Sequence, residues 1–330
     1  MSAGIATVGG FKDQRYRDEV LSARSYGQAL LAAAKANDRI VCLGADLSQP
    51  TETYLFRDEL PDRFFMLGIQ EANMIGVAGG MARCGDIPFA HSFCVFITRR
   101  VYDQIAMQLA YPNANAKIVG FIPGLTTELG VSHQAIDDIA LMRALPNMTV
   151  FEPSGPEQVG AAFQAALDHE GPVYLRLSMM YGAAAPDETT PLVPLERGKG
   201  LIIAQGTDAV IIASGIMVGE ALKARTLLAE RGISAAVANF ASLKPLDTTL
   251  VEELSRTHRV LVTAENHSII GGLGAAVAET IALSDANPRF GMTGVKDVFA
   301  EGGSTAFLLQ RYGLAASDIA RKVEELHRPG

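Results

Sequence analysis

Residues 68–76 read Gly-Ile-Gln-Glu-Ala-Asn-Met-Ile-Gly, and this run decides how the first half of the chain folds. It follows the strand-like run Phe64 to Leu67, and its small and apolar residues predict a helix that continues to Gly80. Glu71 lies in the first turn, where an acid complements the helix dipole without any further role. The apolar neighbours predict instead a buried carboxylate, and burial raises a carboxyl pKa toward values useful in proton transfer. Glu71 is therefore a candidate catalytic acid/base.

Strand-like and helix-like runs alternate on both sides of this stretch. The apolar runs at 39–44, 117–121 and 173–177 are typical of strands buried on both faces. Runs with helical spacing lie between them, and six strands are expected in the first half. This alternation predicts an α/β fold with a doubly wound parallel sheet. The second half alternates in the same way and predicts a second α/β domain.

Composition changes divide the chain into four parts. Residues 1–15 hold Gly9-Gly10 and no apolar period, so we expect a loose arm. Residues 16–182 form the first domain. Residues 183–199 contain three prolines and little periodicity, which predicts a linker. Residues 200–330 form the second domain.

Length and charge exclude several classes of protein. The 330 residues suffice for two domains, and 48% hydrophobic residues can supply their cores. A net charge of −8 argues against a nucleic-acid-binding protein. The longest apolar runs are too short to span a membrane, and the N-terminus lacks the apolar core of a signal peptide. The three cysteines show no metal or redox spacing, so we expect buried, reduced thiols and a cytoplasmic location.

An aromatic pair, Phe93 and Phe96, follows the next strand-like run after Glu71. Together with the Gly-Ile-Gln-Glu run, it resembles the pyrimidine-binding domain of the transketolase family, which uses thiamine diphosphate. The resemblance extends from about Arg24 to the C-terminus. It implies two doubly wound domains: a parallel-sheet pyrimidine-binding domain, followed by a smaller, mixed-sheet transketolase C-terminal domain.

The resemblance also implies roles for these three residues. Glu71 would hydrogen-bond N1′ of the cofactor's aminopyrimidine and so activate the cofactor, whose own chemistry does the rest. Phe93 and Phe96 would line the pyrimidine pocket, with Phe96 stacked on the ring. Core packing alone is the alternative for both phenylalanines. Where the family often has a third aromatic residue, this chain has Arg99.

Two further cofactor-binding candidates, Asp46 and Leu47, follow the strand-like run 39–44. They match an Asp-Leu pair that lies near the thiazolium and the subunit interface in the family; a turn cap is the alternative for the aspartate. His133 matches a histidine that contacts substrate oxygens near the reacting carbon, and a plain surface histidine is the alternative. His267 lies in a Gly-rich run, 265–274, that is expected to be a strand-to-helix junction.

The diphosphate site of the family is missing from this sequence. There is no Gly-Asp-Gly run, and the nearest fragment, Gly85-Asp86-Ile87-Pro88, lacks the second glycine. The chain contributes no metal ligands, so Mg²⁺ and the diphosphate would be held by an N-terminal transketolase subunit. The resemblance therefore implies half of a split enzyme, most simply an α2β2 heterotetramer.

The residues expected to bind substrate also depart from the family pattern. Arg24 matches the first of two arginines that grip a sugar phosphate, but Met179 stands in place of the second. Pro50-Thr51, Leu129 and Phe121 stand near the family's serine, aspartate and extra histidine positions. A thioether cannot replace a bidentate guanidinium on phosphate, so we expect a substrate other than a standard ketose phosphate.

Two other functions remain open at this point. The β subunit of a 2-oxoacid dehydrogenase E1 component has the same two-domain layout. A non-catalytic partner that keeps the fold for assembly or regulation belongs to a different class, and retention of Glu71 with both phenylalanines argues against it. The favoured function is a transferase that moves a two-carbon ketol, or a related acyl carbanion, using thiamine diphosphate.

Overall fold

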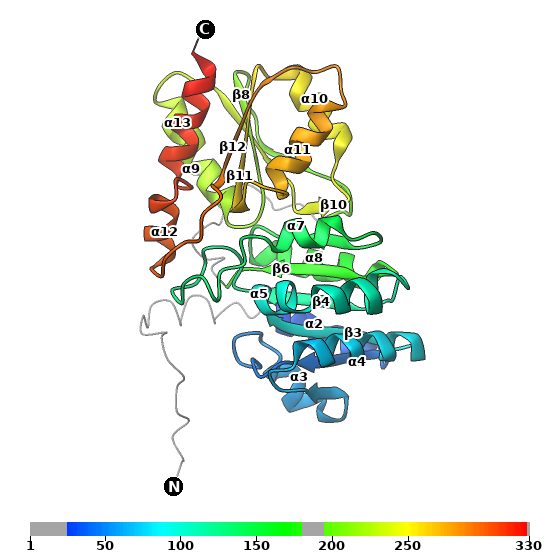
Figure 1. Ribbon diagram of the computed structural model, residues 1–330. Helices are drawn as coiled ribbons and strands as arrows, with labels where there is room; N and C mark the ends of the chain where they lie inside the picture. Colours follow the sequence, from blue (N-terminus) through cyan, green and yellow to red (C-terminus); the bar gives the residue numbers. More distant parts are fainter. Residues whose placement is uncertain (1–24, 180–194, 329–330) are drawn as a thin grey trace.

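The computed structural model describes residues 25–179 and 195–328. Arg24, the expected arm 1–15 and most of the expected linker lie outside the described residues. The described part of the chain forms two sheets, each covered by helices on both faces (Figure 1). None of its helices is both long and apolar enough to cross a membrane.

The first sheet, in the described part, has seven strands in the order β10-β5-β6-β4-β3-β1-β2. Their bounds are β1 Ile40–Gly44, β2 Phe64–Met66, β3 Ile87–Phe93, β4 Lys117–Phe121, β5 Thr149–Phe151, β6 Val173–Leu177 and β10 Ser242–Lys244. The six strands predicted in the first half are present and parallel. The prediction missed β10, which crosses over from the second half and pairs antiparallel with β5.

Helices cover both faces of this sheet. On one face lie α2 Ser25–Ala36, α3 Tyr54–Glu59 and α8 Pro156–Asp168, and on the other α4 Glu71–Cys84 and α7 Asp138–Ala144. The segment that follows β3 is not one continuous helix. It is broken into α5 Cys94–Ile97, η2 Arg99–Val101, α6 Tyr102–Gln104 and the π-helical turn η3 Ile105–Ala110. The break falls at Thr98, whose hydroxyl bonds the Cys94 carbonyl at 2.6 Å.

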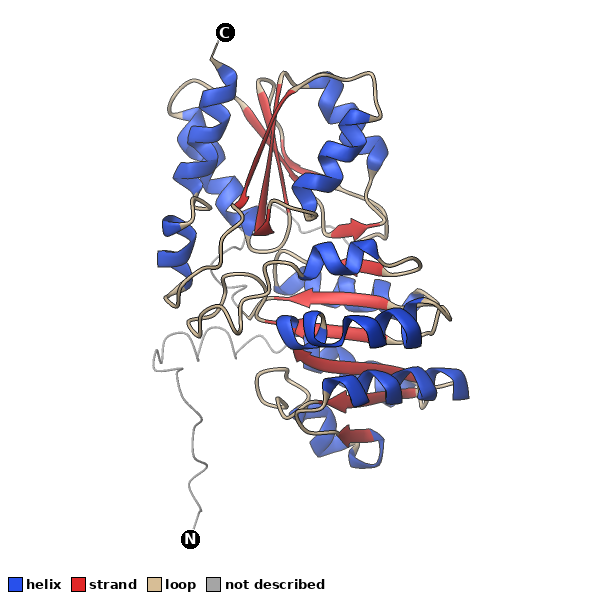
Figure 2. Ribbon diagram, viewed as in Figure 1, coloured by secondary structure: helices blue, strands red, loops and turns tan. Residues whose placement is uncertain are grey.

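The second sheet is mixed, as expected, with five strands in the order β12-β11-β8-β9-β7. Only β7 runs antiparallel to its neighbour. The strands are β7 Leu201–Ala204, β8 Ala209–Ala213, β9 Ala235–Asn239, β11 Val260–Ser268 and β12 Arg289–Val295. The helices are α9 Met217–Ala229, α10 Thr248–Thr257, α11 Leu273–Ala282, α12 Thr305–Arg311 and α13 Ala316–His327. Figure 2 shows helices on both sides of this sheet.

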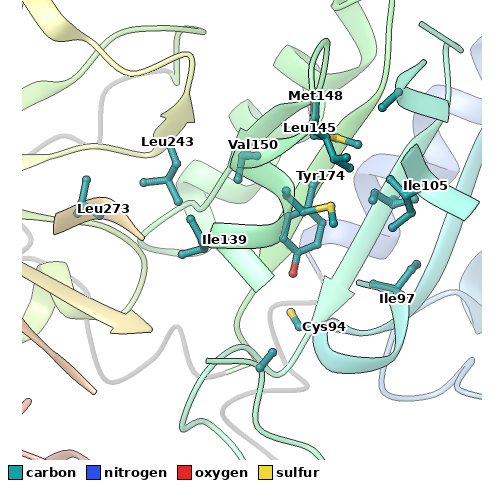
Figure 3. Packing of buried hydrophobic residues seen from close by; sticks show 14 of the residues in the cluster. Cys94, Ile97, Ile105, Ile139, Leu145, Met148, Val150, Tyr174, Leu243 and Leu273 are labelled. Carbon is teal, nitrogen blue, oxygen red and sulfur yellow. The ribbon is translucent and has the colours of Figure 1, made fainter. Parts of the chain in front are cut away.

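One hydrophobic cluster continues from the first domain into the second. In Figure 3, Leu243 and Leu273 from the second half lie beside Ile139, and Val150 and Tyr174 follow toward the first sheet. All five side chains are buried. Burial of this shared apolar surface fixes the two domains against each other.

The cysteines follow the prediction only in part. All three are free, and Cys42 and Cys94 are buried. Cys84, the last residue of α4, is exposed.

A buried ionic network also joins the domains, centred on Arg176 of β6. Its guanidinium is fully buried and binds Asp138 of α7 at 2.7 Å and Glu152, which follows β5. Glu152 accepts a bond from Ser214 of the second domain at 2.5 Å. Two carboxylates keep the buried guanidinium charged and hold its pKa well above the usual value.

The run 265–274 forms the expected strand-to-helix junction between β11 and α11. Glu265 accepts the amides of Leu273 and Gly274 at 2.7 and 2.9 Å, at the start of α11. Burial raises the pKa of this carboxyl to about 8. His267 is buried and accepts the Ala140 amide at 3.4 Å, so it packs the two domains together.

Candidate active site

The candidate residues gather at one edge of the first sheet. Asp46 follows β1, Glu71 follows β2, Phe93 ends β3, His133 follows β4 and Met179 follows β6. Because these strands are parallel, their carboxyl ends share one edge, the usual ligand position in such sheets.

Glu71 opens α4 with its carboxylate turned inward. Gly68, with a φ of 78°, makes the tight turn from β2, and the chain enters the helix after Gln70. Glu71 is 2% exposed, and Met74 and Ile75 are buried beside it on the helix. Ile69, expected to help to bury the carboxylate, is instead 69% exposed because it lies in the turn before the helix.

Two side chains hold the Glu71 carboxylate. The Ser92 hydroxyl of β3 donates to Oε1 at 3.2 Å, and the Arg100 guanidinium donates to Oε2 at 2.8 Å. Arg100 also lies over the ring of Phe96, with its guanidinium carbon 4.2 Å from the centroid. The carboxylate is thus fixed in orientation beside an aromatic face.

Phe93, Phe96 and His133 form one aromatic cluster. The Phe93 and Phe96 centroids are 6.1 Å apart, and the His133 ring meets Phe96 edge-on at 5.1 Å. Phe93 is 6% exposed and belongs to the core, whereas Phe96 is only partly buried. Phe96 therefore combines core packing with partial exposure.

The surroundings of His133 favour its neutral form. Its Nδ1 lies 2.9 Å from the Ser132 hydroxyl. Partial burial and the nearby charge of Arg100 lower the pKa of His133 below its usual value. A neutral imidazole can accept or donate a hydrogen bond, which suits contact with a hydroxyl or carbonyl oxygen.

Asp46 and Leu47 lie at the same edge with different surroundings. Asp46 is exposed in the left-handed region, with a φ of 70°, and its amide lies 3.1 Å from the Met66 sulfur. Leu47 is half-buried and packs partly on the core. Leu47 thus has a packing role, while the Asp46 carboxylate is free to meet solvent or a ligand.

The residues at the positions expected to contact the substrate are mostly apolar. Met179 is half-buried against the core on the α2 and α8 side of the sheet, and Phe121 is a core residue of β4. Leu129 is 41% exposed. Thr51 is buried and donates to the Leu47 carbonyl at 2.6 Å, so its hydroxyl serves the local turn.

Sequence reasoning missed two residues of this site, Ser92 and Arg100. Ser92 precedes Phe93 in β3, and a polar residue in a strand of seven buried residues was an available signal. Arg100 lies four residues after Phe96, a spacing at which a cation reaches an aromatic ring on a helix. The neighbouring Arg99 instead binds Asp137 through two contacts of 2.8 Å.

Family models match both domains. The model "Transketolase, pyrimidine binding domain" matches residues 19–181, and "Transketolase, C-terminal domain" matches residues 198–319. The chain belongs to the transketolase family. Both the family resemblance and the two-sheet architecture expected from the sequence are confirmed.

Several transketolase relatives match almost the whole chain. The chain is 42% identical to a 6-deoxy-6-sulfo-D-fructose transketolase subunit, SqwH, of Clostridium sp. (strain MSTE9), over 92% of this chain and 93% of the relative. It is 40% identical to a putative transketolase C-terminal section of Methanocaldococcus jannaschii, over 92% and 95%. A 1-deoxy-D-xylulose-5-phosphate synthase of Symbiobacterium thermophilum is 33% identical, and the match spans 46% of that relative.

Solved structures agree with this assignment. A structure described as a split gene transketolase, inactive β4 tetramer, superposes with a TM-score of 0.83 at 43% identity. That match covers 92% of this chain and 98% of the other. The transketolase from Leishmania mexicana shares the fold, with a TM-score of 0.76 at 20% identity.

Transketolase-family proteins use thiamine diphosphate with a divalent metal, and this site fits the pyrimidine half of that cofactor. A buried carboxylate, Glu71, and a partly buried aromatic ring, Phe96, both contact the Arg100 guanidinium, and this pair of groups suits an aromatic ring that carries a basic nitrogen. Among the described residues, no group of three or more His, Cys, Asp and Glu side chains is arranged to hold a metal.

Proposed function

We propose that this chain is the C-terminal subunit of a split, thiamine-diphosphate-dependent transketolase-like enzyme. The observation that carries the proposal is the buried Glu71 carboxylate held by Ser92 and Arg100 beside Phe96. Relatives that are themselves separate subunits or sections of a transketolase support it. The reaction is transfer of a two-carbon ketol or a related acyl carbanion.

The cofactor, when bound, supplies a nucleophilic carbon that accepts the transferred unit. The residues of this chain orient it and handle protons. Glu71 would exchange a proton with N1′ of the pyrimidine, and Ser92 would fix the direction of its carboxylate. Phe96 would hold the pyrimidine ring, with Phe93 supporting Phe96. Asp46 and Leu47 would hold the thiazolium half, and His133 would contact substrate oxygens.

The proposal includes a partner subunit. The sequence has no Gly-Asp-Gly run for the diphosphate, so an N-terminal transketolase subunit would hold the diphosphate and Mg²⁺. Two-fold pairing then completes two sites in an α2β2 heterotetramer. The inactive β4 tetramer described for a split-gene relative supports a requirement for the other subunit.

The proposed donor lacks the usual terminal phosphate. Met179 stands where a second phosphate-gripping arginine is expected, and its half-buried thioether offers no positive charge to a dianionic phosphate. The SqwH relative acts, by its name, on a 6-deoxy-6-sulfo ketose, so a sulfonated donor belongs among those tested.

The test compares donors for the assembled enzyme. We expect kcat/KM for xylulose 5-phosphate to be lower, by about tenfold or more, than for the best unphosphorylated or sulfonated ketose, because a charge-assisted bond contributes roughly 1.5–3 kcal/mol. Met179→Arg should improve use of the phosphorylated donor. Leu283→Arg, which adds the same charge at a side chain 91% exposed in the second domain, should not.

Three outcomes would contradict the proposal. A clear preference of the unmodified enzyme for the phosphorylated ketose would overturn the donor assignment. Cofactor binding without transfer from any ketose or 2-oxoacid would favour a non-catalytic partner subunit, and turnover with 2-oxoacids alone would favour the dehydrogenase β subunit.

A further inference from the structure

Residues 122–135 form a closed loop between β4 and α7 that carries His133. The loop begins with Ile122 and Gly124, both left-handed, with φ values of 53° and 55°. It closes on itself, because the Gly124 amide donates to the Ala135 carbonyl at 3.0 Å. A buried β-branched residue with a positive φ is costly, so the surrounding structure must hold this loop in place.

Asn266, near the end of β11 in the second domain, fixes the start of the loop through two hydrogen bonds. It is 1% exposed. Its Oδ1 accepts the Leu125 amide at 2.9 Å, and its Nδ2 donates to the Pro123 carbonyl at 3.1 Å. One carboxamide thus bonds the loop backbone twice, once as acceptor and once as donor.

The contact is so close that the loop needs glycine at its centre. A Cβ on Gly124 would lie 2.2 Å from the Asn266 carbonyl oxygen and 2.4 Å from its Oδ1. Glycine at position 124 therefore allows both the left-handed turn and the approach of Asn266.

The end of the loop is held by Arg176 of β6 and by a backbone carbonyl of the second domain. The Arg176 guanidinium donates to the Ala135 carbonyl at 3.1 Å and to the Asn266 carbonyl at 3.0 Å. Gln134 donates to the Glu301 carbonyl of the second domain at 2.9 Å. Figure 1 shows the loop region after β4 extending toward the segment that leads into α12.

We infer that Asn266 is a positioning residue, through which the second domain places His133 against Phe96. The path runs from the Asn266 carboxamide through Pro123 to Leu125, along the closed loop, to the His133 ring 5.1 Å from Phe96. This inference rests on the proposed function, in which His133 contacts substrate oxygens. It gives the second domain a share in substrate handling through the placement of His133.

The first test measures hydrogen exchange of the full chain by mass spectrometry. Asn266→Asp keeps the acceptor for Leu125 but loses the donor to Pro123, and Asn266→Ala loses both. We expect exchange in peptides covering 122–135 to rise at least about tenfold in both variants, since local opening governs exchange. Exchange in β4 and β6 should stay unchanged.

Arg143→Met is the matched control. Arg143 also crosses between the domains, donating to the Gly271 and Gly272 carbonyls at 2.6 and 3.0 Å, but it does not touch the loop. It should leave exchange in 122–135 unchanged. Unchanged loop exchange in both Asn266 variants, or an equal rise in Arg143→Met, would overturn the inference.

The second test uses the assembled enzyme. Small displacements of positioned groups cost up to about 10²-fold, so Asn266→Ala should lower kcat/KM by about 10- to 100-fold. In a His133→Ala background the same change should cost less than about twofold, because both act through one group. Cofactor affinity should change less than about threefold, since Asn266 acts through His133 and not through Glu71.

The outcomes separate this inference from the proposed function. An equal loss of kcat/KM in both backgrounds would show that Asn266 does not act through His133. A parallel fall in cofactor affinity would indicate a general structural role instead and would also overturn the inference. Failure of the unmodified assembly to bind thiamine diphosphate would overturn the proposed function itself.

Discussion

Glu71→Gln is expected to lower turnover of the assembled enzyme by about 10²–10⁴-fold, the usual contribution of a positioned acid/base. Glutamine keeps the shape of the side chain but cannot exchange a proton with the pyrimidine. It also loses the ion pair with Arg100, which is 45% exposed and can turn to solvent. The fold should therefore stay intact. Hydrogen–deuterium exchange at the cofactor's C2 should slow by a similar factor.

The control for this experiment is Glu59→Gln. Glu59 is an exposed acid of α3 that pairs with Lys35 at 3.1 Å, on the other face of the sheet. Its loss should leave both turnover and C2 exchange unchanged. If Glu71→Gln exchanges deuterium at the normal rate, another group must activate the cofactor.

Arg176→Met is expected to lower the free energy of unfolding by about 3–5 kcal/mol, because it leaves buried carboxylates without a partner. Asp138 and Glu152 both bind the guanidinium, and both are at least 97% buried. The loss corresponds to a change of roughly 10²-fold to 4 × 10³-fold in the folding equilibrium, at about 1.4 kcal/mol for each factor of ten. Urea denaturation monitored by circular dichroism measures it.

Two variants sharpen this result. Arg256→Met removes an exposed i,i+4 pair with Glu252 at 2.8 Å, and it should cost only about 0.3–0.5 kcal/mol. Arg176→Lys keeps the charge but not the planar fork, so it should recover only part of the loss. A loss below about 1 kcal/mol in Arg176→Met would mean that the network does not hold the domains together.

Local patterns were sufficient to predict most of the fold. Runs such as Lys117–Phe121 and Val173–Leu177 are apolar throughout or nearly so, and their bounds match β4 and β6. The parallel sheet then places Glu71, Phe93 and His133 at one edge, because each lies at or just after the carboxyl end of a strand. The burial of Glu71 was predictable from its helix, with Met74 and Ile75 on the same element.

The two strands that the sequence did not predict, β10 and β12, lack a local sequence pattern. β10 has only three residues, and its partner β5 lies about ninety positions earlier. β12 contains Gly291 and Gly294, which are unfavourable in isolated strands. Gly294 is needed because a Cβ there would lie 2.9 Å from the His267 carbonyl oxygen. Such close approaches depend on the tertiary structure and leave no periodic pattern.

The contacts within the site were less predictable than the position of the site at the carboxyl edge of the sheet. Arg100 meets Glu71 across about 30 residues of sequence, from the segment in which the helix after Phe96 is broken. Asn266 meets the 122–135 loop across about 140 residues of sequence. Both contacts are set by how separate elements pack, so neither could be read from residue spacing alone.

Calorimetry tests the claim that this chain holds half of a cofactor site. Thiamine diphosphate with Mg²⁺ is titrated into the purified chain, and then into the chain assembled with an N-terminal transketolase subunit. Binding should be weak for the single chain, and tight and Mg²⁺-dependent for the assembly. Glu71→Gln in the assembly should retain Mg²⁺ dependence, because the metal is held by the other subunit. Tight, Mg²⁺-dependent binding to the single chain would contradict the claim.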